Sequence, residues 1–247
     1  MANPVKSRDY RSQAAVVLLR KIGDEASARQ QLERVLADDP AHALAQETLG
    51  EILEARGDFP ALAGLLERRL SALDGEDKNE TRLLLAELYE DRLGDIDRAE
   101  THFRAVADDA PRKLDAWKGL ERIYSRKENY EGLLASLRAQ VELASTPRQR
   151  IGLFERIGLL LEEEFVNHAE AAACFEDIVA IDPGNDAANS ALARMYRQLG
   201  RFEDVVQTLV RHAGTAKDDK RKVELMLAAV RTLTVDIGSP ERAMEMC

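Results

Sequence analysis

The chain has 247 residues, of which 45% are hydrophobic, 32% are charged and only 5% are aromatic. This composition, in which Ala and Leu are the main apolar residues, is typical of amphipathic helices rather than sheets. The formal net charge of −10 argues against a surface that follows a phosphate backbone, so no nucleic-acid partner is expected.

No secretory signal is expected at the N-terminal region, because the apolar run at 13–19 is followed at once by Arg20 and Lys21. No stretch has the apolar length of a membrane helix, so no membrane insertion is expected. The two cysteines, Cys174 and Cys247, are too few for a disulfide framework and are predicted to be small buried apolar groups. These features predict a cytoplasmic protein.

A long period runs through the chain. Positions of similar residue type recur at intervals of 71 and 72 residues: Pro40, Pro111 and Pro183; Phe59, Tyr130 and Phe202; Leu66, Leu137 and Leu209. A fixed period indicates one supersecondary unit stacked on itself.

Each period contains two halves with a helix-turn-helix pattern. One half is clearest at 49–66 and recurs at 120–137 and 192–209. Within it, Gly50 is expected where two helices approach closely, Gly57 is predicted to end the first helix, and Pro60 suits the first turn of the second. The other half, at 85–111, places apolar residues along one helical face.

The two kinds of half differ in turn length and in a terminal proline, and the two kinds alternate along the chain. Units that begin near 79, 151 and 223 carry one extra residue between their helices, since Ala86 and Ala99 are 13 residues apart instead of 12. Units that begin near 43, 114 and 186 lack a terminal proline. They run instead into polar stretches at 74–80, 145–150 and 214–220, which are predicted to be exposed connections.

This pattern resembles the tetratricopeptide repeat, a helix pair with the signature W-x2-L-G-x2-Y, A-x3-F and P. Trp117, Leu120 and Tyr124 match the first part, and Ala99, Phe103 and Pro111 match the second, as do Ala171, Phe175 and Pro183 and, more weakly, Ala28, Leu32 and Pro40. The resemblance implies an all-α fold, a right-handed α-solenoid of stacked antiparallel helix pairs. It extends over 1–247 as seven units that begin near 9, 43, 79, 114, 151, 186 and 223.

The last unit stops at Cys247, only about one helical turn beyond Ala243. A stacked array needs a polar cap over its terminal apolar face. The sequence therefore predicts a truncated last unit, a fragment of a longer chain, and an end that allows end-to-end self-association.

Catalytic and metal motifs are missing from the sequence. His42, His102, His168 and His212 lie in different units without HxxxH or HExxH spacing, and they are predicted to be surface or turn residues. There is no G-x-S-x-G elbow and no glycine-rich phosphate loop. No enzyme activity, metal or cofactor is expected.

In the tetratricopeptide family the first helix of each pair lines a concave groove, and the resemblance implies which residues lie there. Three units present acidic residues: Glu47, Glu51 and Glu54; Glu87, Glu90 and Asp91; Glu155, Glu162 and Glu163. Two units present basic residues: Lys118, Arg122 and Arg126; Arg194 and Arg197. Such charges either select a partner of mixed charge or pair with one another on successive helices.

The favoured hypothesis is a non-enzymatic scaffold or adaptor that binds an extended peptide or a helix of another protein along this groove. A carboxylate clamp for chaperone C-termini is not expected, because an acidic unit separates the basic ones and Asn189 falls one step off the groove register. The alternative hypothesis is a structural spacer or self-assembly module of a larger multidomain protein or enzyme.

Overall fold

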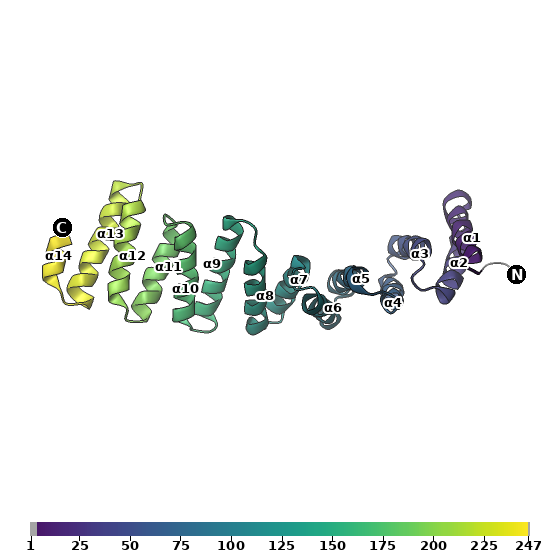
Figure 1. Cartoon of the computed structure of the whole chain (residues 1–247), viewed down its shortest axis with the longest axis horizontal. Helices are drawn as coiled ribbons and strands as arrows, with labels where there is room; N and C mark the ends of the chain where they lie inside the picture. The colour runs from purple at the N-terminus through teal and green to yellow at the C-terminus, as the bar shows by residue number, and fades with distance from the viewer. Residues whose placement is uncertain (1–3, 247) are drawn as a thin grey trace. The chain divides into compact units, whose positions relative to one another are not determined.

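The structure, a computed structural model, describes residues 4–246, which form α-helices and short π-helical turns and contain no strand (Figure 1). The first helices of successive pairs are α1 (Pro4–Val17), α3 (Ala43–Arg56), α5 (Gly75–Leu88), α7 (Leu114–Arg126), α9 (Pro147–Glu163), α11 (Asp186–Gln198) and α13 (Asp219–Arg231). The second helices are α2 (Glu25–Asp38), α4 (Phe59–Leu70), α6 (Ile96–Asp109), α8 (Tyr130–Leu143), α10 (His168–Ile181), α12 (Phe202–Thr215) and α14 (Pro240–Met246). The predicted all-helical fold is confirmed.

The chain divides into two compact units, Met1–Ile123 and Tyr124–Cys247, and the division falls inside α7. In the first unit each helix from α1 to α6 packs against the next one along the chain, and in the second unit the same holds from α8 to α14. Consecutive helices joined by short turns run antiparallel, as stacked helix pairs require.

The alternation in turn length is visible in the hydrogen bonds that close each pair. In short turns the backbone N–H donates to a carbonyl five residues back, as from Asp58 to Leu53 at 2.9 Å. In the longer turns the bond spans six residues, as from Asp95 to Tyr89 at 2.9 Å. The six-residue bonds occur in the pairs that hold residues 18–24, 89–95, 161–167 and 233–239, so the first pair shares the predicted extra residue.

The extra residue is absorbed mostly as a π-helical turn. Such turns follow α1, α5 and α13 at Leu18–Ile22 (η1), Tyr89–Leu93 (η2) and Thr232–Asp236 (η3). The turn after α9 differs, because α9 runs to Glu163 and no π-helical turn follows it. The left-handed position that Gly94 occupies at φ 67° is held there by Val166 at φ 50°. Gly57, at φ 68°, ends α3 as predicted, and the Asp58 carboxylate caps α4 by accepting from the Ala61 N–H.

Three helices begin about four residues earlier than predicted, so the polar stretches are partly helical. α5, α9 and α13 start at Gly75, Pro147 and Asp219. At α9 the reason is a capping box: Thr146 accepts from the Gln149 N–H at 3.3 Å, and the Gln149 side chain accepts from the Thr146 N–H at 3.2 Å. The local sequence T-P-R-Q therefore starts a helix where a connection was predicted.

The periodic prolines close the junctions between pairs. Their carbonyls accept hydrogen bonds from side chains six residues later: Gln46 to Pro40 at 2.5 Å, Trp117 to Pro111 at 2.8 Å and Asn189 to Pro183 at 3.0 Å. Three different residue types at equivalent positions thus donate the same hydrogen bond to a proline carbonyl. Because Asn189 is used in this way and is only 1% exposed, it lies off the groove surface as expected.

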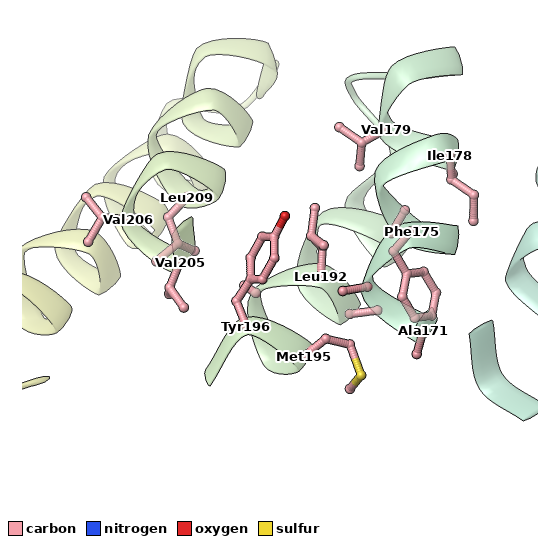
Figure 2. Packing of buried hydrophobic residues seen from close by; sticks show 14 of the residues in the cluster. Ala171, Phe175, Ile178, Val179, Leu192, Met195, Tyr196, Val205, Val206 and Leu209 are labelled. Carbon is pink, nitrogen blue, oxygen red and sulfur yellow. The ribbon is translucent and has the colours of Figure 1, made fainter. Parts of the chain in front are cut away.

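The core of each unit consists of small and aliphatic residues. In the second unit, Figure 2 shows Phe175 of α10 near Leu192 of α11, and Tyr196 of α11 beside Val205 of α12. In the first unit, Leu32, Leu49 and Leu53 belong to a cluster formed by α1 to α4. Each pair buries its apolar face against the next, which is the driving force for stacking.

Candidate functional site

All of the predicted groove residues lie on first helices of the pairs or on the π-helical turn η2, and several of them pair with one another. Three ion pairs join residues 31 or 32 positions apart: Arg20–Glu51 at 3.3 Å, Arg122–Glu90 at 2.7 Å and Arg194–Glu162 at 2.7 Å. Glu90 and Arg122 occupy the positions of Glu162 and Arg194, 72 residues later, whereas Arg20 lies one position further along its turn than Glu90 and the charges of its pair are exchanged. At these sites the pairing alternative is realised.

Glu90 is not a surface acid, which corrects the prediction for this residue. Its side chain is 0% exposed, and the Arg122 guanidinium donates two hydrogen bonds to it. These bonds raise the pKa of Arg122, with further contributions from Asp91 and Glu87. Glu90 is therefore not presented on the surface to a partner.

A groove of about 650 Å³ opens between α3, α4 and α5 in the first unit, and we call it the acidic groove. Its acidic lining residues are Glu47, Glu51, Glu54, Glu87 and Asp91, all five of which were predicted from the sequence. Its apolar lining includes Leu62, Leu65, Leu66, Leu84 and Leu88. The site therefore combines an apolar floor with an acidic rim.

Gly50 lines this groove, and a side chain built there would not be blocked, although the sequence predicted a close approach of two helices at this position. A Cβ atom at Gly50 would lie 3.8 Å from Leu62 Cδ1, which is ordinary van der Waals contact. At Gly158, its counterpart in a later pair, a Cβ atom would lie 2.9 Å from the Phe175 ring. Leu66 stands where that pair has Phe175, and its smaller side chain leaves the space open.

Four of the groove acids have no ion-pair partner within residues 4–246: Glu47, Glu54, Glu87 and Asp91. Two basic side chains, Arg69 and Arg92, also line the groove, and Arg92 lies over the Phe59 ring at 5.4 Å. The groove thus keeps an excess of negative charge.

The other predicted residues lie elsewhere. Glu155 and Arg194 line a smaller hollow of about 210 Å³ between α9, α10 and α11. Arg197 lines a hollow of about 600 Å³ along α13 and η3, together with Arg231. Glu163 is exposed on α9, and Lys118 and Arg126 are exposed on α7. The structure therefore brings five predicted acidic residues of α3, α5 and η2 together in the acidic groove, and places Glu155 and Arg194 together in a smaller hollow.

Two titratable residues outside the groove, His212 and Cys174, are wholly or partly buried. His212 is only 3% exposed, contrary to the prediction of a surface residue, and lies 3.2 Å from Asp186. Cys174 is half-buried rather than buried, and burial raises its pKa to about 11, so it is a poor nucleophile at neutral pH. Cys247 lies outside the described residues.

Within residues 4–246, no three His, Cys, Asp or Glu side chains are placed to hold a metal ion. In the same range no helix is long and apolar enough to cross a membrane.

Solved structures of helical repeat proteins are similar to this chain. MamA has 19% identity over 72% of this chain and 92% of its own, with a TM-score of 0.43. A tetratricopeptide repeat protein from Parabacteroides merdae has 18% identity over 98% and 93%, with a TM-score of 0.47. YrrB, a TPR protein with an unusual peptide-binding site, has 15% identity over 73% and 89%, with a TM-score of 0.44. No curated protein matches the chain.

Four family models described as tetratricopeptide repeat match residues 14–77, 80–112, 116–151 and 160–230. The matches follow one another along most of the chain, and each spans at least parts of two consecutive helices. They agree with the signature residues Trp117, Phe103 and Phe175 and with the helix-pair architecture. The chain belongs to the tetratricopeptide repeat family.

Proposed function

We propose that this chain is a non-enzymatic scaffold that binds an extended peptide or a helix of another protein along the first helices of its pairs. The observation that supports this function best is the acidic groove, because it offers an apolar floor and four carboxylates that form no ion pair with any residue of 4–246. Interfaces of this kind bind through a buried apolar centre and a polar rim.

Charge reversal at the rim tests the proposal. The variant Glu47→Lys/Glu87→Lys/Asp91→Lys changes three exposed groove residues, whereas Asp38→Lys/Asp108→Lys/Glu142→Lys makes the same charge change on second helices. We expect the wild type and the second-helix variant to capture the same partner proteins from a native extract. The groove variant should fail to capture them. Equal capture by both variants would argue against the groove.

A self-assembly module is the second candidate, favoured by apolar side chains exposed on the last pair. Leu227, Val235 and Met244 are 61%, 71% and 71% exposed. Exposed apolar patches often mark interaction surfaces. Light scattering over a dilution series, with Leu227→Glu/Val235→Glu beside the wild type, distinguishes this candidate: self-association that the variant removes supports it, and a monomer at all concentrations excludes it.

A further inference from the structure

The floor of the acidic groove has room for a side chain that this chain does not supply. Gly50 lacks a side chain, and the nearest atom to a Cβ built there is 3.8 Å away. Leu84, on the facing wall, is 51% exposed although it lines the groove. Covering such apolar area with a partner side chain yields about 25 cal/mol per Å².

The charges around this space are arranged on two facing helices. Glu47 and Glu54 are seven residues apart on α3, so they lie on one helical face, and Glu87 and Asp91 are four residues apart across α5 and η2. Glu51 lies between the first two but is engaged by Arg20. Two basic side chains, Arg69 and Arg92, line the same groove. Arg122, whose pKa Glu87 and Asp91 help to raise, is held by Glu90.

We propose that the acidic groove binds a basic amphipathic segment of a partner protein, with one apolar side chain over Gly50 and Leu84 and flanking Lys or Arg side chains against Glu47, Glu54, Glu87 and Asp91. This proposal rests on the proposed function and adds the chemistry of the partner. An acidic segment would meet like charges on both walls, which costs affinity and slows association. An uncharged apolar segment would leave the carboxylates desolvated without partners.

The second unit offers a comparison surface of different charge. The hollow along α13 and η3 is lined by Arg197, Arg231 and the exposed Leu227 and Val235, with Asp236 as its acidic group. A segment that recognises the acidic groove by charge should not bind there. Substitutions at Arg197 and Arg231 therefore serve to identify binding that uses the other surface.

The experiment selects peptides from a random phage-displayed library on the intact chain and measures their affinity by titration calorimetry. Gly50→Leu fills the floor of the groove. Gly64→Leu is the matched control, since Gly64 lies on α4 outside the groove lining and a Cβ there meets nothing within 4 Å. Circular dichroism and thermal melting establish that both variants fold.

We expect selected peptides to carry Lys or Arg around an apolar residue and to bind Gly50→Leu and Glu47→Lys/Glu87→Lys/Asp91→Lys about tenfold more weakly or worse, with Gly64→Leu unchanged. Raising salt from about 50 mM to about 500 mM should weaken binding further, because exposed charges are screened. If Gly50→Leu does not fold, the charge-reversal variant and the salt series decide whether the peptides bind in the acidic groove.

Other outcomes would contradict the basic partner, the groove or the proposed function, and each outcome is distinguishable from the others. Acidic peptides that lose affinity for Arg197→Glu/Arg231→Glu, but not for Gly50→Leu, would exclude the basic partner while leaving a scaffold function. Peptides that bind every variant equally would exclude the groove. A library that yields no binder at all would count against both this inference and the proposed function.

Discussion

The Glu90 carboxylate is fully enclosed and accepts two hydrogen bonds from Arg122, 3.1 Å from Nε to Oε1 and 2.7 Å from Nη2 to Oε2. Glu162 occupies the equivalent position and is 20% exposed in its pair with Arg194, and Glu51 is 48% exposed in its pair with Arg20. Ion pairs between neighbouring helix pairs thus occur in three different degrees of burial. Burial governs what an ion pair contributes, because an enclosed carboxylate that loses its partner cannot return to water.

Removal of the arginine from each of the three ion pairs should therefore destabilise the chain most where the paired carboxylate is most buried. We expect Arg122→Met to lower the free energy of unfolding by about 3 kcal/mol, Arg194→Met by about 1 kcal/mol and Arg20→Met by about 0.3 kcal/mol. Urea denaturation measures the three losses. The double variant Glu90→Gln/Arg122→Met should recover part of the first loss, and three equal losses would contradict the role of burial.

Gly119 and Gly50 should respond oppositely to alanine. A Cβ atom at Gly119 would lie 2.5 Å from the Phe103 ring, so Gly119→Ala should destabilise by about 2 kcal/mol despite a better helix propensity. Gly50→Ala meets no such contact and should stabilise by about 0.5 to 1 kcal/mol. Thermal melting compares the two, and Phe103→Leu should rescue Gly119→Ala. A neutral Gly119→Ala would show that α7 can shift.

Replacement of Val166 by glycine should stabilise the protein. It has φ 50°, a conformation that costs a β-branched residue about 1 kcal/mol or more, and at 66% exposure its side chain contributes little packing. Val166→Gly should therefore raise the melting temperature. The reverse change, Gly200→Val at φ 70°, should lower it. Lower stability of Val166→Gly would indicate that the valine packs more than its exposure suggests.

His212 should make stability fall in mild acid. Burial lowers its pKa below the ordinary 6.5; Asp186 opposes this shift and Arg221 adds to it. Below pH 6.5 the unfolded chain then binds more protons at this residue than the folded chain, so the free energy of unfolding falls as pH falls. Urea midpoints at about pH 7.5 and about pH 5.5 should differ less for His212→Gln than for the wild type. Equal differences in the wild type and in His212→Gln would exclude His212 as a cause of the pH dependence.

Local sequence determines the helix pairs. Gly57 at the end of α3, Asp58 as the cap of α4 and the 12- or 13-residue spacing within a pair act over a few neighbouring residues, so their consequences can be predicted without the fold. The early start of α9 is of the same kind. Its capping box at Thr146 and Gln149 is a local signal that could have been read from the sequence.

Tertiary structure decided the candidate site. The sequence by itself placed Glu90 and Glu87 together among groove residues, but packing of successive first helices enclosed Glu90 against Arg122 and left Glu87 exposed. The groove at Gly50 likewise depends on Leu66, a residue 16 positions away that is smaller than Phe175 in a later pair. Helix formation depends on near neighbours, whereas burial, ion pairing and open space depend on which side chains other helices bring into contact.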